Sequence, residues 1–192
     1  MAKKHFSFNN KNRYDGLTKA YSFRFTETPD FKKYDDHIAN SANEGHSEGF
    51  DNISLITKDT YKLGTEATLK CSFEGRGCPE IILVRKPELC EDGMTRYGEC
   101  VEIVLWRGGI NVWRHYMAPD HDCSWNNISR FKTPIKEGEI YDLHVKIEDK
   151  YVYFSAGGVS GNVRIEDLFD EFYVGVTVCE GIARLYELTV DG

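Results

Sequence analysis

The sequence predicts an all-β fold, a sandwich or a barrel built of many short strands. Short runs alternate apolar and polar residues with a period of two, and Gly, Asn and Asp turns separate these runs. Aromatic residues, which favour strands, make up 13% of the chain. Residues 165–171 give the main helical signal, and we expect no more than one short turn there. Many short strands between turns are typical of a sandwich or a barrel.

Strands are predicted along most of the chain, over residues 20–26, 52–57, 67–73, 80–86, 141–148, 151–156, 172–179 and 184–190. In the first run Tyr21, Phe23 and Phe25 share one face. The run over 80–86 is apolar on both faces, which predicts a strand covered on both sides. Residues 30–50 are polar and rich in turn residues, so we expect a long loop or an edge region there.

Length and composition limit the protein's class. The chain of 192 residues contains no repeat, low-complexity linker or shift in composition, so we expect one domain over residues 1–192. A net charge of −7 disfavours nucleic acid as a partner. No signal peptide and no apolar stretch of about 20 residues are found, so we expect a cytoplasmic protein without membrane contact. The six cysteines are then expected to be reduced thiols.

The last third of the chain resembles a known superfamily. The matching runs are residues 141–148, 151–154 with Gly157-Gly158, 172–178 and 183–190, with Asp149-Lys150 as a hairpin turn. They resemble the closing strands of the concanavalin A-like lectin/glucanase (laminin G-like) superfamily. The resemblance implies a two-sheet antiparallel jelly-roll sandwich. Members include lectins, glycosidases, polysaccharide lyases and adhesion modules, so the fold leaves the activity open.

The segment over residues 99–116 is the most informative about function. Gly108-Gly109 predicts a two-residue hairpin turn, since glycine adopts positive φ without strain. That turn would pair Trp106 with Asn111 and Glu102 with His115. Alternation then places one set of side chains on a single face of the hairpin, namely Glu102, Val104, Trp106, Asn111, Trp113 and His115, and places Val101, Ile103, Leu105 and Val112 on the core face.

The polar and aromatic face has the residue types of a saccharide site. Indole rings such as Trp106 and Trp113 stack on a sugar ring, while Asn111 and Glu102 hydrogen-bond hydroxyl groups. The alternative is structural: the indoles pack beneath loops, and His115 is a cross-strand partner of Glu102.

Two further residues are candidates for the same site. Trp125 is expected in a loop that overhangs the aromatic face, or else as a loop anchor on the rim of the sandwich. Arg85 is a candidate ligand-binding residue, and an ion pair at the sheet margin is its alternative.

The evidence for catalysis is mixed. Retaining glucanases of the superfamily have a Glu-x-Asp-x-Glu strand, which is absent here because Glu99 and Glu102 fall on opposite faces. Glu80 is a candidate second acid from another strand. A lyase would use His115 as base and Arg85 to neutralise a uronate. Glu102 and His115 are therefore the candidate catalytic residues.

Metal binding is weakly indicated. The spacing of His115, His121 and Cys123 matches no standard arrangement. The resemblance implies at most a structural Ca²⁺, with Asp191 as candidate ligand, and we expect no other cofactor.

Three hypotheses follow. The first is a carbohydrate-binding protein, and the second is an intracellular glycoside hydrolase or a polysaccharide or oligosaccharide lyase. The third is a homo-oligomeric or partner-binding scaffold whose aromatic face is buried in an interface.

Overall fold

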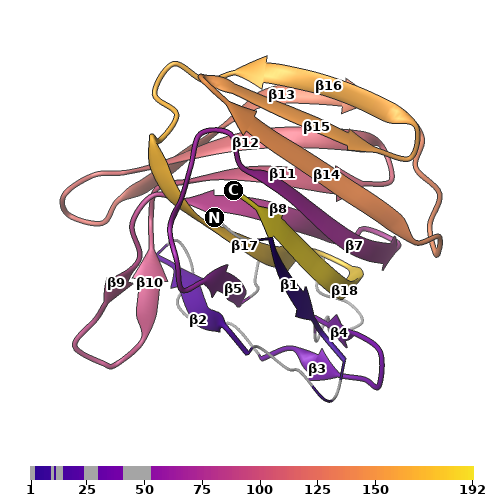
Figure 1. The fold of residues 1–192 in the computed structure, drawn as a ribbon, viewed down its shortest axis with the longest axis horizontal. Coiled ribbons are helices and arrows are strands. Elements are labelled where there is room, and N and C mark those ends of the chain that lie inside the picture. Colours follow the sequence, from indigo (N-terminus) through magenta and orange to yellow (C-terminus); the bar gives the residue numbers. More distant parts are fainter. Residues whose placement is uncertain (1–2, 10, 12–14, 24–29, 41–52) are drawn as a thin grey trace.

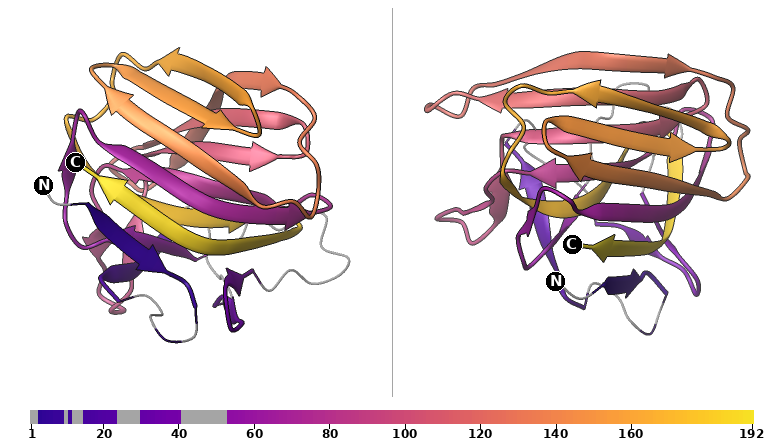
Figure 2. Two further views of the ribbon diagram at one scale, coloured as in Figure 1. Left: turned by 45° about the vertical axis from the view of Figure 1, so that its right-hand side comes forward. Right: turned by 45° about the horizontal axis from the view of Figure 1, so that its top comes forward.

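The computed structural model describes residues 3–9, 11, 15–23, 30–40 and 53–192. Across these ranges the regular elements are all strands, arranged in two sheets that face each other (Figures 1 and 2). The predicted all-β sandwich is therefore confirmed. None of the described residues forms a helix that could span a bilayer.

The first sheet is antiparallel and has eight strands among the described residues. In order across the sheet these are β16 (Val159–Arg164), β15 (Tyr151–Ala156), β14 (Tyr141–Glu148), β7 (Glu66–Glu74), β18 (Ile182–Asp191), β4 (Ile38–Ala39) and β3 (Lys32–Lys33). β1 (Lys4–Ser7) also pairs with β18, so the two ends of the chain meet in this sheet (Figure 1).

The second sheet has ten strands among the described residues. Their order is β13 (Cys123–Lys132), β12 (Gly109–Met117), β11 (Cys100–Trp106), β8 (Cys78–Val84), β17 (Glu171–Cys179), β5 (Ser54–Thr57), β2 (Leu17–Ser22), β10 (Thr95–Tyr97) and β9 (Glu88–Leu89), with β6 (Tyr61–Lys62) also paired to β17. The pairing is antiparallel except between β2 and β10, which run parallel.

The core fills the space between the sheets. Alternate residues of each strand point inward and form one large apolar cluster; on β8 they are Ile81 and Leu83, and on β7 they are Leu69 and Cys71. The other face of the ten-stranded sheet, called the outer face below, is partly covered as well. There Ala20, Ile56, Ile82, Val84, Tyr97 and Cys100 form a second cluster. β8 is consequently buried on both faces, as its continuous apolar run predicted.

The predicted strands of the last third match closely. β14 and β15 have the predicted bounds, and Asp149 forms the turn between them with φ of 53°. Residues 165–170 contain a turn and no helix, and Glu171 begins β17. Within residues 30–40 lie the short edge strands β3 and β4. β2 begins three residues before the predicted run, and residues 24–26 and 52 of the predicted strands lie outside the described residues.

Several strands escaped the prediction. β13 and β16 lie at the ends of their sheets and expose much of their length, so their sequences lack apolar alternation. β13 also contains Trp125, which was expected in a loop; that expectation was wrong because the pairing with β12 extends from Met117 to Gly109.

Candidate functional site

A cavity of about 390 Å³ opens on the outer face of the ten-stranded sheet. The strands β8, β11, β12, β13 and β17 form most of it. Its lining consists of Ser22, Arg76, Cys78, Glu80, Tyr97, Glu102, Val104, Trp106, Arg107, Asn111, Trp113, Trp125, Thr177, Val178, Cys179 and Glu180.

The hairpin beside the cavity turns one residue earlier than predicted. Trp106 pairs with Gly109, so the two-residue loop is Arg107-Gly108 and not Gly108-Gly109. The chain after β13 binds this loop, because Thr133 N–H donates to the Gly108 carbonyl (3.0 Å) and Ile135 N–H to the Arg107 carbonyl (3.1 Å). Contacts from the segment that follows β13, which the two-strand pattern does not contain, therefore stabilise the turn at this position.

The predicted division of side chains between the two faces is nevertheless correct. The true register differs by two positions along the partner strand, and a shift of two leaves every side chain on its face. Glu102 faces Trp113, and Val104 faces Asn111. Five of the six predicted face residues line the cavity, namely Glu102, Val104, Trp106, Asn111 and Trp113.

Three indole rings contribute to the lining. Trp106 and Trp113 are half-buried, whereas Trp125 is 42% exposed. Trp106 lies against Gly108, where an added Cβ would approach the ring to 2.4 Å. The ring of Trp125 stacks over His115 with 6.4 Å between centroids and 21° between planes. The three rings thus come from three neighbouring strands: Trp106 from the end of β11, Trp113 from β12 and Trp125 from β13.

Polar groups accompany the indoles. Trp106 Nε1 and Asn111 Oδ1 are buried and have no hydrogen-bond partner in the part of the chain that the structure describes. Buried polar groups in folded proteins are nearly always paired, so each unpaired group calls for an explanation such as a bound molecule. A hydroxyl group, which both donates and accepts, can satisfy either kind of atom.

Two carboxylates belong to the same cavity. Glu102 on β11 is two residues before Val104, and Val104 lies directly opposite Glu80 on β8. Glu80 and Glu102 are therefore diagonal neighbours on one face, with Cβ atoms about 7–8 Å apart at most. The sequence suggested Glu80 only as one candidate, because the pairing of β8 with β11 is not encoded in either strand alone.

His115 is placed differently from the prediction. The side chain is 3% exposed and does not line the cavity. Its Cα partner is Cys100 and not Glu102, yet its Nε2 still forms a hydrogen bond of 2.8 Å with Glu102 Oε2. His115 holds Glu102 from beneath, so the structural alternative for this residue describes its position better than a role as exposed base.

Several protonated groups lie beneath and beside the carboxylates. Burial raises the pKa of the Cys100 thiol well above its usual range, and the nearby Glu102 and Glu80 add to the effect. Burial is also the main cause that raises the pKa of the Tyr97 hydroxyl above its usual range. The Tyr97 hydroxyl also lies 2.7 Å from Ser54 Oγ. Both carboxylates therefore act on the same buried thiol and phenol.

A pair of thiols forms the end of the cavity. Cys78 and Cys179 are directly opposite on β8 and β17, and both are free. A hydrogen bond to Cys78 and burial raise the pKa of the Cys179 thiol, and Glu80 contributes in the same direction. All six cysteines of the chain are free in the structure.

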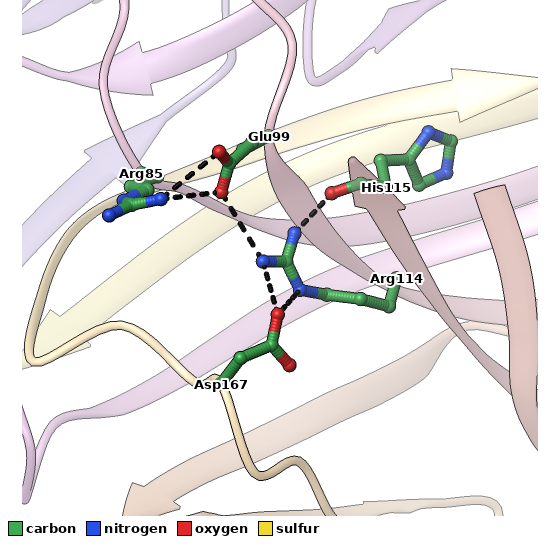
Figure 3. Close-up of polar contacts among 5 residues, drawn as sticks. All are labelled: Arg85, Glu99, Arg114, His115 and Asp167. Carbon is green, nitrogen blue, oxygen red and sulfur yellow. Dashed lines mark hydrogen bonds and ion pairs between the residues drawn. The ribbon is translucent and has the colours of Figure 1, made fainter. Parts of the chain in front are cut away.

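Arg85 does not belong to the cavity, which corrects its assignment as a ligand-binding residue. Arg85 directly follows β8 and continues the alternation of Ile81 and Leu83, which face the core, so it lies on the opposite side of the sheet from the cavity. Its Nη1 binds both carboxylate oxygens of Glu99, at 3.0 and 2.9 Å. Arg114 Nη2 contacts the same Glu99 (3.3 Å) and Asp167 (2.8 Å) (Figure 3). The ion pair at the sheet margin, named above as the alternative, is what the structure contains.

The candidate metal ligands are also rearranged. Asp191 is exposed and belongs to no cluster of three His, Cys, Asp or Glu side chains among the described residues, so nothing here supports a Ca²⁺ site at Asp191. His121 stacks on Phe23 at 4.2 Å instead of approaching His115. The structure instead brings together Cys100, Glu102 and His115, whose ligand atoms all lie within 4.8 Å of one another. Sequence analysis missed Cys100, which the correct hairpin register would have placed opposite His115.

Comparison with known proteins establishes the fold. No known family model matches the chain, and no curated protein matches it in sequence. Solved structures match over most of its length. A carbohydrate-binding module, CBM66 from Bacillus subtilis, gives a TM-score of 0.64 at 13% identity, covering 92% of this chain and 96% of that one.

Two enzymes show the same architecture. A glycosidic hydrolase gives a TM-score of 0.61 at 9% identity, covering 99% of this chain and 95% of its own. A family 7 alginate lyase, A1-II′, gives 0.52 at 16% identity, covering 86% and 82%. The protein therefore has the jelly-roll fold of the concanavalin A-like lectins and glucanases, as the closing strands predicted. At these identities the likeness describes the fold and leaves the function to the site.

Proposed function

We propose that the protein binds a saccharide in the cavity on the outer face of the ten-stranded sheet. The observation that supports this function is the meeting of three indoles with Asn111, Glu102 and Glu80 around one hollow. Rings stack on the apolar faces of a sugar, and amide and carboxylate groups bind its hydroxyls. A volume of about 390 Å³ falls within the range of small-molecule sites. The carbohydrate-binding module with the same fold adds a precedent.

The test is a glycan array followed by calorimetric titration of the tightest ligand. Each stacked ring is expected to contribute about 1 kcal/mol, so Trp106→Ala and Trp113→Ala should each weaken binding roughly five- to tenfold. The double variant should abolish measurable binding. Tyr153→Ala is the matched control, since Tyr153 is a 38% exposed aromatic residue of the other sheet. Equal affinity of the double variant and the wild type would exclude this cavity as the site.

Hydrolysis of the bound saccharide is a second candidate, favoured by the two carboxylates. Glycosidases use a carboxyl pair about 5–5.5 Å apart when retaining and about 6.5–9.5 Å apart when inverting. The diagonal placement of Glu80 and Glu102 is compatible with such a pair. A lyase that uses His115 and Arg85 is less well supported, because neither side chain lines the cavity.

Turnover of an oligosaccharide panel tests the second candidate. Glu80→Gln and Glu102→Gln should each lower the rate a hundredfold or more, because an acid or base contributes about 10²–10⁴ in rate. Rates equal to the wild type in both variants would exclude Glu80 and Glu102 as catalytic acid and base, and saccharide binding alone would remain as the proposed function. The scaffold hypothesis stays a prediction that light scattering of the purified chain tests.

A further inference from the structure

We propose that Cys100, Glu102 and His115 bind a transition metal ion, Zn²⁺, at the wall of the cavity. Side chains of one hairpin form this site, and it does not depend on saccharide binding. Cys100 and His115 are directly opposite on β11 and β12, and Glu102 is two residues from Cys100 on the same face. Strand pairing therefore presents a thiol, an imidazole and a carboxylate side by side.

The distances are close to those of a zinc site. Zn–S bonds of about 2.3 Å and Zn–N or Zn–O bonds of about 2.0–2.2 Å place tetrahedral ligand atoms roughly 3.4–3.6 Å apart. Here the three ligand atoms lie within 4.8 Å of one another, and His115 Nε2 is 2.8 Å from Glu102 Oε2. The ligand atoms would have to move by only about 1 Å to reach the spacing of a tetrahedral zinc site.

The ligand types select the metal. A thiolate and an imidazole favour Zn²⁺ and disfavour Ca²⁺ and Mg²⁺, which prefer oxygen ligands. Three protein ligands leave one tetrahedral position for water or another small ligand, as in catalytic zinc sites. Glu102 lines the cavity and its side chain is 19% exposed, whereas Cys100 and His115 are buried behind it. The open position would thus face the cavity.

Charge and protons balance on binding. The thiol of Cys100 loses its proton to solvent. The proton that His115 Nε2 shares with Glu102 moves to His115 Nδ1 by a change of tautomer, so that Nε2 and the carboxylate bind the metal in place of their hydrogen bond. One thiolate and one carboxylate then neutralise the two positive charges of the ion. A buried charge is tolerated when it is paired or coordinates a metal, so this neutral centre suits the buried positions of Cys100 and His115.

The experiment uses the full chain, freed of metal with a chelator and kept reduced. Calorimetric titration with Zn²⁺ should show one equivalent bound, and Co²⁺ should give the near-ultraviolet thiolate-to-metal absorption band. Cys100→Ser should remove the Co²⁺ band and weaken Zn²⁺ binding roughly a hundredfold or more, since even supporting residues change metal affinity 10–100-fold. Cys90→Ser, a half-exposed thiol between β9 and β10, should leave both signals unchanged.

Glu102→Gln provides a second variant on the cavity wall, should Cys100→Ser fail to fold. It should weaken Zn²⁺ binding while keeping the thiolate band at saturating Co²⁺. The proposal is overturned if the wild type binds no Zn²⁺ at micromolar concentration, or if Cys100→Ser or Glu102→Gln binds it as tightly as the wild type. Because the titration contains no sugar, its failure is distinct from failure of the glycan array.

Discussion

Arg114 shows how one buried charge is stabilised at the margin of the sandwich. Its side chain is 2% exposed and lies on the core face of β12. Asp167 accepts hydrogen bonds from Nε (3.2 Å) and Nη2 (2.8 Å), and the guanidinium stacks over Tyr116 (4.4 Å) and Phe169 (4.7 Å). The charge is therefore paired, and the loop between β16 and β17 is fixed to β12 (Figure 3).

Replacing Arg114 should destabilise the fold strongly. Arg114→Ala removes the packed guanidinium, leaves Asp167 without this partner and leaves Glu99 bound by Arg85 alone, so we expect a loss of about 3 kcal/mol in the free energy of unfolding. Arg85→Ala is the control, because Arg85 binds the same Glu99 from a 59% exposed position and should cost less than about 1 kcal/mol. Urea denaturation measures both, and equal losses would contradict the importance of burial.

The buried thiols predict how stability depends on pH. Burial raises the pKa of the Cys71 thiol, with a smaller contribution from Asp142. Above about pH 8.5 the unfolded chain releases this proton while the folded chain keeps it, so stability falls as pH rises. The limit is about 1.4 kcal/mol per pH unit for each such thiol. Cys71→Val should make the decline shallower in denaturation at pH 8 to 10 with reductant, and an unchanged slope would refute the assignment.

At the scale of elements, the β11–β12 hairpin shows that the face of each side chain could be predicted from the sequence, whereas the position of the turn could not. The alternation of apolar and polar residues fixed the face of each side chain, and that prediction was correct for Trp106, Asn111 and Trp113. The turn position was wrong because β13 pairs with β12 as far as Gly109, where a Cβ would lie 1.8 Å from the Phe131 carbonyl oxygen. Gly109 is thus required by its neighbour strand and by its φ of 133°, not by a place within the turn.

The two glycines of this hairpin should respond differently to substitution. Gly108→Ala would force the Trp106 ring to move, so we expect weaker saccharide binding and changed tryptophan fluorescence with little loss of stability. Gly109→Ala would meet the Phe131 carbonyl in a strained conformation and should cost about 2 kcal/mol or more. Calorimetric titration and urea denaturation distinguish them. Unaltered fluorescence and affinity in Gly108→Ala would show that the ring position is unimportant.

At the scale of the molecule, residues distant in sequence share one core. β1 pairs with β18, so strands from the beginning and the end of the chain are neighbours in the eight-stranded sheet. Phe131 of β13 packs edge-on against Phe154 of β15 at 4.9 Å, which joins the two sheets at their other side. The inner faces of both sheets contribute to one apolar cluster. A local opening would therefore expose core residues contributed by several strands.

A shared core predicts cooperative unfolding, as expected for one domain over residues 1–192. Differential scanning calorimetry under reducing conditions should show one transition with equal calorimetric and van't Hoff enthalpies. Glu80→Gln, a change at the cavity, should not split the transition. Two resolved transitions would show that the chain contains independently folding parts.

The sequence by itself predicted the all-β class, the closing strands and the face on which the aromatic residues gather, because alternation is a local property of each strand. The two-sheet sandwich was implied by the resemblance of the closing strands to a known superfamily. Only the tertiary structure decided the rest. It buried His115 beneath Glu102, removed Arg85 from the site, added Glu80 to it and placed Cys100 opposite His115. These outcomes depend on which strands pair and in what register. Pairing and register are determined by contacts between segments far apart in the chain, and the alternation of residues within a single strand does not encode those contacts.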